Sequence, residues 1–221
     1  MRKEKIITGE YYHVYSRGAD RRLTFYDDHD RERFIRSMIA FNDLNNKEKK
    51  LSRLKCRPVT STRPLVKILS YALMPNHHHF LVRQLVDDGI GLYMQRIGAG
   101  YACYFNKRHK RTGCLWESEY KAVRIETDAQ LLHISRYIHL NPLKLFFPNW
   151  KTDGVPCWEE AHHALKLYMW SSYPHFLGIV DDPLVNDGLF ATLFSNATDY
   201  ENFMHEWVMS APEMSAPQAR T

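Results

Sequence analysis

The sequence contains no run of about 18 apolar residues, so it predicts no membrane-spanning helix. Its charged first five residues are not followed by an apolar segment, and we therefore expect no secretory signal. No G-x-x-x-x-G-K-S/T loop occurs, which predicts a reaction without ATP and without a nucleotide cofactor. The cysteines form no C-x-x-C pair, which argues against a zinc ribbon and favours a reducing, cytoplasmic setting: Cys56, Cys103, Cys114 and Cys157.

The sequence does contain enough apolar material for a core, together with an excess of positive charge. Hydrophobic residues make up 44% of the 221 positions and aromatic residues 13%, which predicts one folded domain with additions. The formal net charge is +5, and seven basic residues against two acidic ones fall between Gln95 and Arg124. Such clustering is typical of a surface that binds a phosphate backbone, although a solvated helix end followed by a loop gives the same pattern.

Hydrophobic periodicity predicts a chain of mixed α and β structure. Alternating residues indicate strands at Tyr11–Ser16, Val66–Leu73, His77–Val82 and Tyr120–Ile125, with the second expected in the centre of the sheet. Helical spacing indicates helices at Asp30–Leu44, Gly89–Lys107 and Asp128–Leu140, with a loop at Asn45–Pro64. Beyond Pro142 we expect irregular, aromatic-rich structure, a small helical segment within Asp181–Val208 and a disordered end from Ser210. Together these elements predict an α+β fold with a mainly antiparallel sheet.

Three adjacent histidines open the third predicted strand. Because side chains alternate along a strand, His77 and His79 point to one face and His78 to the other. Two imidazoles at this spacing can hold a divalent ion from one side, with its other ligands supplied by oxygen groups, water or a substrate phosphate. The alternative is a polar strand edge that binds no metal. The apolar residues Phe80 and Val82 favour an internal strand over a solvated edge.

The last long predicted helix carries a tyrosine and an asparagine four positions apart. Thr127 and Gln130 form a capping-box pattern at its start, and Pro142 ends it because the residue before a proline disfavours the α region. Tyr137 and Asn141 therefore share one face, where the phenol oxygen could act as a nucleophile and the amide oxygen as a metal ligand. The alternative is a core aromatic followed by a helix C-cap.

The order of these segments resembles that of a known family. Pro75–Leu81 is similar to the HUH motif, in which two histidines flank a usually hydrophobic residue, and Tyr137–Pro142 is similar to the tyrosine helix of the single-tyrosine transposases. Within that group the sequence resembles in particular the REP-associated tyrosine transposases. The resemblance extends over about Tyr11–Gly178 and includes His13–Gly18, Arg111–Glu117 and Trp170–Tyr173. One departure is His78, which occupies the position that is usually aliphatic.

The resemblance implies a fold and a site. The fold would be ferredoxin-like, βαββαβ, with a central antiparallel sheet, the HUH motif on a central strand and the nucleophile on a following helix. Residues 1–180 would form the nuclease and transposase domain, and residues 181–221 a partly helical C-terminal extension. Tyr137 would attack a phosphodiester, while His77, His79 and Asn141 would bind magnesium or manganese.

The resemblance also implies a partner, single-stranded DNA folded into hairpins at palindromic repeat elements, and a cytoplasmic, nucleoid-associated protein of bacteria that is a monomer or homodimer. With the basic stretch, it predicts these DNA-binding residues: Arg17, Arg96, Lys107, Arg108, Lys110, Arg111, Trp116, Lys121 and Arg124. Tyr101, Tyr104 and Phe105 would either stack on bases or lie in the core. The alternative functions are an HUH replication initiator or relaxase, and a non-catalytic module that binds hairpin DNA.

Overall fold

The computed structural model describes residues 5–45, 63–186 and 188–210. Most of the loop predicted at Asn45–Pro64, and the end predicted to be disordered beyond Ser210, lie outside the described residues. No helix within these ranges is long and apolar enough to cross a membrane.

Four strands form one sheet: β1 (Tyr11–Arg17), β2 (Val66–Met74), β3 (His77–Gln84) and β4 (Lys121–Ile125). Their order is β2-β3-β1-β4 and every neighbouring pair is antiparallel. With one helix after β1 and another after β3, this is the predicted ferredoxin-like βαββαβ arrangement. One prediction is wrong, because β2 lies at the edge of the sheet. The central positions belong to β3 and β1, so the histidine-rich strand is internal.

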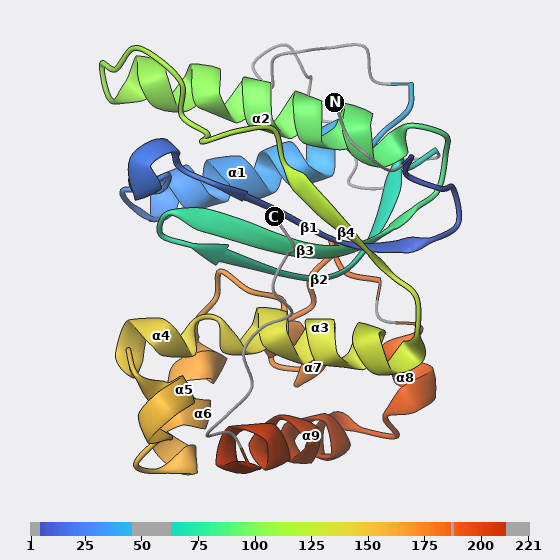
Figure 1. The fold of residues 1–221 in the computed structure, drawn as a ribbon, viewed down its shortest axis with the longest axis vertical. Helices are drawn as coiled ribbons and strands as arrows, with labels where there is room; N and C mark the ends of the chain where they lie inside the picture. Colours follow the sequence, from blue (N-terminus) through green and yellow to red (C-terminus); the bar gives the residue numbers. More distant parts are fainter. Residues whose placement is uncertain (1–4, 46–62, 187, 211–221) are drawn as a thin grey trace.

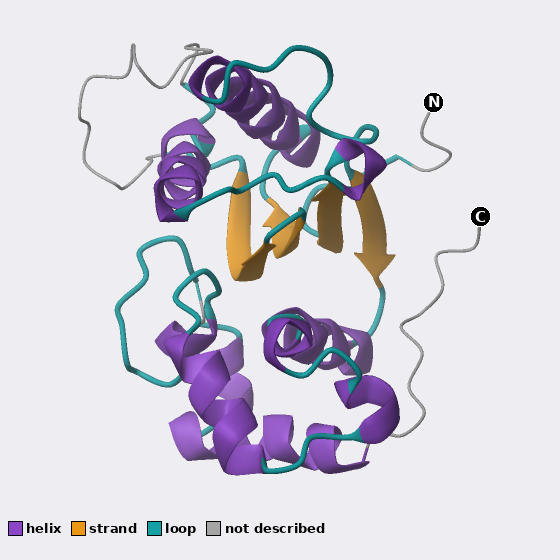
Figure 2. Ribbon diagram, turned by 90° about the vertical axis from the view of Figure 1, so that its left-hand side faces the viewer, coloured by secondary structure: helices purple, strands orange, loops and turns teal. Residues whose placement is uncertain are grey.

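Helices cover both faces of the sheet (Figures 1 and 2). On one face lie α1 (Asp28–Phe41) and α2 (Gly89–Arg108), whose apolar sides meet β1, β2 and β3 in a core that includes Phe34, Phe80 and Tyr101. On the other face lies α3 (Asp128–Leu140), which packs Leu131 and Ile138 against the sheet. The sheet therefore separates the two long helices α1 and α2 from α3.

The bounds predicted for α3 are confirmed, but the reason given for its end is wrong. At the start, the Thr127 side chain accepts a hydrogen bond from the Gln130 backbone N–H. At the end, Asn141 and Pro142 both keep helical dihedral angles, so the proline does not push its predecessor out of the α region. The helix ends because Pro142 has no N–H to donate to the Ile138 carbonyl, which accepts from the Asn141 N–H at 3.3 Å instead.

The chain after Pro142 is helical rather than irregular, which corrects the prediction. It forms α4 (Leu143–Phe146), α5 (Trp150–Asp153), α6 (Trp158–Leu167), α7 (Tyr173–Phe176), α8 (Phe190–Leu193) and α9 (Ala197–Ser210), so the small helical segment expected within Asp181–Val208 is confirmed. These helices enclose a second core on the side of α3 away from the sheet (Figure 1). A 3-10 turn, η1 (Ala19–Arg21), follows β1.

Residues after position 180 share their cores with the residues before it. Phe190 packs with Leu131 in the core beneath the sheet. The Tyr200 hydroxyl lies 2.7 Å from Nδ1 of His139 on α3, and Nε2 of that histidine lies 2.7 Å from the Ser172 hydroxyl. The division into residues 1–180 and 181–221 stays a prediction, but the two parts are packed together through α3.

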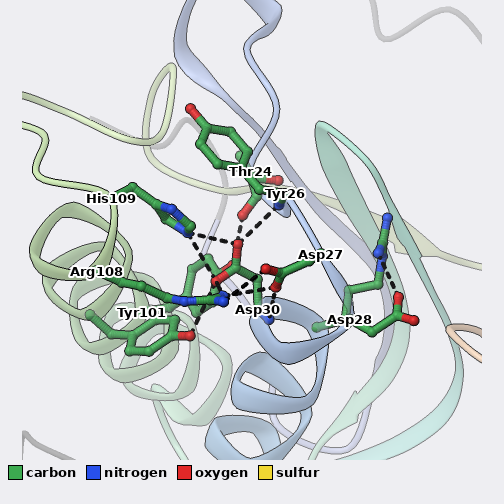
Figure 3. Close-up of polar contacts among 10 residues, drawn as sticks. Thr24, Tyr26, Asp27, Asp28, Asp30, Tyr101, Arg108 and His109 are labelled. Carbon is green, nitrogen blue, oxygen red and sulfur yellow. Dashed lines mark hydrogen bonds and ion pairs between the residues drawn. The ribbon is translucent and has the colours of Figure 1, made fainter.

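A buried carboxylate joins the start of α1 to the end of α2 (Figure 3). The Asp30 side chain is inaccessible to solvent, and it pairs with the Arg108 guanidinium and with Nε2 of His109, the latter at 2.9 Å. It also accepts hydrogen bonds from the Tyr26 N–H and the Tyr104 hydroxyl. Burial of a charge is tolerated when it is paired and hydrogen-bonded in this way, so this cluster fixes how the two helices meet.

His78 is buried on the α1 and α2 side of the sheet, opposite to its two neighbours. Its ring contacts Phe34, Phe80 and Trp116, with centroid distances of 5.0, 4.7 and 5.2 Å. Neither ring nitrogen has a hydrogen-bond partner among the described residues. Burial lowers the pKa of His78 to about 3, so the imidazole is neutral in the folded protein at neutral pH.

His78→Leu is expected to stabilise the protein. At pH 7 the free energy of unfolding should rise by about 1–3 kcal/mol, because an unsatisfied polar group leaves the core. The unfolded chain binds a proton at this position near pH 6.5 and the folded chain only near pH 3. The free energy of unfolding of the wild type therefore decreases as the pH decreases. Between pH 7 and pH 5 the wild type should lose about 2 kcal/mol through this group, and the variant should not.

Urea denaturation at both pH values measures this difference. His163→Leu, at an exposed histidine of α6, is the control and should change the free energy of unfolding by less than about 0.5 kcal/mol. A His78→Leu variant less stable than wild type at pH 5 would contradict the prediction.

Candidate active site

The pairing of β1 with β3 gathers polar side chains on the face of the sheet that α3 covers. Tyr15 lies opposite His79, and Arg17 opposite His77. Because side chains alternate, His13, Tyr15 and Arg17 share this face with the two histidines. The His13 and His79 rings are stacked with centroids 5.1 Å apart, and the Tyr15 ring lies 5.7 Å from that of His79. The prediction that His77 and His79 share one face, and that His78 takes the other, is confirmed.

In both His77 and His79, the Nδ1 atom takes part in a hydrogen bond. Nδ1 of His77 lies 2.6 Å from Oδ1 of Asn76, and since an amide oxygen only accepts, this Nδ1 donates and Nε2 keeps its lone pair. Nδ1 of His79 lies 2.9 Å from Nε2 of His13, which can hold the same tautomer. Burial lowers the pKa of His77 to about 4 and that of His79 well below its usual value. Both rings are therefore neutral at neutral pH, the form that binds metal ions.

Tyr137 of α3 meets these histidines edge-on. Its ring centroid lies 5.5 Å from that of His79 and 5.8 Å from that of His13. The tyrosine is half-buried, which leaves part of the side chain accessible. Burial raises the pKa of its phenol, and a hydrogen bond with the Asn141 side chain opposes that effect. The phenol is thus protonated at neutral pH and requires activation to act as a nucleophile.

Asn141 lies at the end of α3, next to Tyr137. It is 4% exposed, and its Nδ2 donates to the Tyr137 carbonyl oxygen at 2.8 Å, the i, i+4 contact that the spacing predicts. The alternative interpretation as a helix C-cap is correct for its position, although its backbone is right-handed helical rather than left-handed. The C-cap position places the Asn141 amide beside the Tyr137 phenol, and its role as a metal ligand stays a prediction.

The donor set fits a divalent cation that keeps open positions. No cluster of three or more His, Cys, Asp or Glu that could hold a metal ion occurs among the described residues. Two neutral imidazoles and one amide oxygen would leave several positions for water and phosphate oxygens. The centroids of the His77 and His79 rings lie 5.0 Å apart, and the angle between the two ring planes is 88°. Two imidazoles that bind one cation at about 2.1 Å hold their ring centres about 4.6–5.3 Å apart when the ligand–metal–ligand angle is roughly 90–109°, so the separation of these rings fits a shared cation.

Sequence reasoning assigned no role to His13. The sequence feature that could have indicated a role is the alternation that places His13, Tyr15 and Arg17 on one face of β1. This alternation becomes informative only when the pairing of β1 with β3 is known. Burial, together with repulsion from His133, lowers the pKa of His13 to about 4, so it too is neutral at neutral pH. Its contact with His79 makes it a residue that orients a candidate ligand.

The predicted DNA-binding residues lie on several elements, and some of them make contacts within the protein. Arg17 is exposed beside the histidines, and Lys107, Lys110 and Lys121 are exposed on α2, the loop after it and β4. The other side chains make contacts within the protein: Arg96 with the Asp43 carbonyl, Arg108 with Asp27 and Asp30, Arg111 with the Phe105 ring, Arg124 with Glu10, and Trp116 with the Gly98 carbonyl. Of the aromatics, Tyr101 and Phe105 lie in the core, and Tyr104 is half-buried. The predicted roles in DNA binding stay predictions.

Comparisons with known proteins agree with the fold. The model of the family described as IS200-like transposases matches residues 8–141, which hold the sheet and α1 to α3. A solved structure of a REP-associated tyrosine transposase bound to a REP hairpin has a similar fold, with a TM-score of 0.51 and 13% identity. The likeness covers 84% of this chain and 96% of that one. A comparison with curated protein sequences gave no match.

Proposed function

Because the chain belongs to the family of IS200-like transposases, we propose that it cuts and rejoins single-stranded DNA at palindromic hairpins through a covalent bond to Tyr137. The observation that carries the proposal is the contact of the Tyr137 ring with the His79 and His13 rings. This contact brings a phenol from α3 to two imidazoles of the sheet, which lie 58 and 124 positions earlier in the sequence. A tyrosine with only a packing role needs no such neighbours.

The proposed reaction is a transesterification. The Tyr137 oxygen attacks the phosphorus atom, and the bond between that phosphorus and the 3′-oxygen breaks. The products are a 5′-phosphotyrosine and a free 3′-hydroxyl. The phenol gives up its proton, and the departing 3′-oxygen takes one. Since the phosphotyrosine keeps the energy of the ester, another 3′-hydroxyl can later displace the tyrosine without a nucleotide cofactor.

Each neighbouring residue has a part in this proposal. His77 and His79 would hold a divalent cation, magnesium or manganese, with Asn141 as the third protein ligand. Asn76 and His13 would fix the orientation of the two imidazoles through their Nδ1 atoms. A cation bound there polarises the phosphate and stabilises the charge that builds up on its oxygens. Two nitrogen ligands favour manganese over magnesium.

The proposed substrate is a hairpin with an adjoining single strand. The structural neighbour is bound to a REP hairpin, and this supports a hairpin as the partner of this chain. A two-tyrosine helix, as in some HUH replication initiators, receives no support from α3. The residue two positions after Tyr137 is His139, which is buried and bonded to Tyr200 and Ser172.

The test is formation of a covalent adduct with a labelled single-stranded hairpin oligonucleotide that has flanks on both sides. With magnesium or manganese, denaturing gels should show labelled protein, and EDTA should prevent it. Manganese should support adduct formation at lower concentration than magnesium. Adduct formation by metal-free protein would contradict the metal dependence, and no adduct from any hairpin substrate would contradict the proposed function.

His77→Ala should slow adduct formation by about 100-fold or more at limiting manganese, because losing a residue that merely orients a ligand already costs 10–100-fold. Excess manganese should restore part of the rate if the other ligands remain. Single-turnover rates against manganese concentration measure the effect. His163→Ala, at an exposed histidine of α6, should behave as wild type. An unchanged rate in His77→Ala would place the metal site elsewhere.

A further inference from the structure

Three cationic side chains surround the candidate site from three different elements. Arg17 is the exposed last residue of β1 and lies opposite His77. Lys144 of α4 is exposed, and its backbone N–H donates to the Asn141 carbonyl at 3.2 Å. Lys151 of α5 is half-buried, with its ammonium 5.0 Å from the centre of the Tyr137 ring. The candidate nucleophile and metal ligands thus lie among three positive charges.

None of these three cations forms an ion pair within the described part of the chain. Some cations elsewhere do form ion pairs, among them Arg108 with Asp27, Arg124 with Glu10 and Lys166 with Glu201. Asp153, two positions after Lys151, accepts a hydrogen bond from the Thr152 hydroxyl. No acidic side chain among the described residues therefore balances the positive charge at the site.

The three charges also act on the site and on one another. Burial, and then repulsion by Arg17 and Lys144, lower the pKa of His77. Burial and repulsion by Lys144 lower the pKa of Lys151. Like charges gathered around a partly buried site raise its potential, which costs stability unless an anion binds there. The arrangement suits an anion with several separated charges better than a single ion, because the cations come from β1, α4 and α5.

We infer that Arg17, Lys144 and Lys151 form a cradle for consecutive phosphates of a single DNA strand, on the two sides of the bond that Tyr137 attacks. The identity of that bond rests on the proposed function. Lys144 and Lys151 lie beyond residues 8–141, which match the family model. The cradle lies on the α3 side of the sheet, whereas α2 with Lys107 lies on the other (Figure 1). Because its residues surround Tyr137 and the candidate metal ligands, we assign the cradle to the strand beside the hairpin and not to the hairpin stem.

Binding measurements without metal test the cradle apart from the chemistry. In a Tyr137→Phe background with EDTA, fluorescence anisotropy gives the affinity for a blunt hairpin and for the same hairpin with a single-stranded extension, at several salt concentrations. For each probe, the logarithm of the binding constant is plotted against the logarithm of the salt concentration. The difference between the two slopes reports the phosphate contacts to the extension. Each phosphate contact on a single strand contributes about 0.7 to the slope.

The cradle variant carries Arg17→Gln, Lys144→Gln and Lys151→Gln, and the matched control carries Lys107→Gln, Lys110→Gln and Lys121→Gln. Both remove three positive charges. In the cradle variant the contribution of the extension should fall by about 2 in slope, while blunt-hairpin binding stays within about twofold. The control should leave the contribution of the extension unchanged.

Two results would overturn the cradle: an unchanged contribution of the extension in the cradle variant, or an equal loss in both triple variants, which would mean that net charge alone decides. If the triple variant binds neither probe, single variants decide, because Lys151→Gln should lose about 0.7 in slope and Lys151→Arg should keep it. The proposed function fails by a different result, the absence of a covalent adduct from wild-type protein.

Discussion

Tyr137→Phe is expected to abolish the covalent adduct and to reduce cleavage by about 10⁵-fold or more, as removal of a nucleophile does in other enzymes. Phenylalanine keeps the ring against His79 and His13, and it keeps the Lys151 ammonium over a ring face. Only the oxygen that would form the bond to phosphorus is lost. Affinity for hairpin DNA should therefore stay within about threefold of wild type. Single-turnover cleavage and anisotropy on the same substrate measure the two quantities.

Tyr15→Phe is the matched control for this variant. Tyr15 is also a half-buried tyrosine that contacts His79, with ring centroids 5.7 Å apart, but it comes from β1 instead of α3. Its hydroxyl has no role in the proposed reaction, so the rate should fall by less than about tenfold. An adduct that persists in Tyr137→Phe and disappears in Tyr15→Phe would move the nucleophile to the strand.

Asp30→Ala is expected to lower the free energy of unfolding by about 3–5 kcal/mol, the cost of removing one partner from a buried ion pair. The Asp30 carboxylate accepts from the Tyr26 N–H, Arg108 and His109 (Figure 3). It also accepts from the Tyr104 hydroxyl. Asp27 still neutralises Arg108 in the variant, but the other donors lose their acceptor. Urea denaturation at pH 7 measures the loss.

Asp28→Ala provides the comparison on the same helix. Asp28 pairs with Arg31 at 2.9 Å, but its side chain is 71% exposed. Exposed pairs contribute about 0.2–1 kcal/mol, so this variant should lose no more than that. Equal losses in Asp28→Ala and Asp30→Ala would mean that burial of the carboxylate does not matter.

The elements that the sequence predicted best are those that local chemistry determines. The bounds of α3 follow from the hydrogen bond between Thr127 and Gln130 at one end and the missing N–H of Pro142 at the other. Alternation along β3 correctly separated His78 from its neighbours. The i, i+4 spacing correctly placed Asn141 beside Tyr137. Each of these relations spans only a few residues.

The elements that sequence reasoning missed depend on partners far away in the chain. An apolar run predicts a buried strand, but not whether other strands flank it, so β2 was assigned to the centre instead of the edge. His13 contacts His79 across 66 positions, and Arg108 pairs with Asp30 across 78. Arg108 and Arg124, two members of the basic stretch, pair with acids from other segments, which the stretch itself does not reveal; their roles in DNA binding stay predictions. Only the fold reveals these pairings.

The contacts that hold α3 in place determine which histidines Tyr137 can reach. One side of this helix packs on its own sheet, and His139 on another side bonds to Tyr200 and to Ser172, whose hydroxyl also accepts from the Tyr71 N–H of β2. These contacts hold α3 against the sheet of the same polypeptide. Tyr137 and the histidines that it contacts therefore belong to one copy of the chain in this structure.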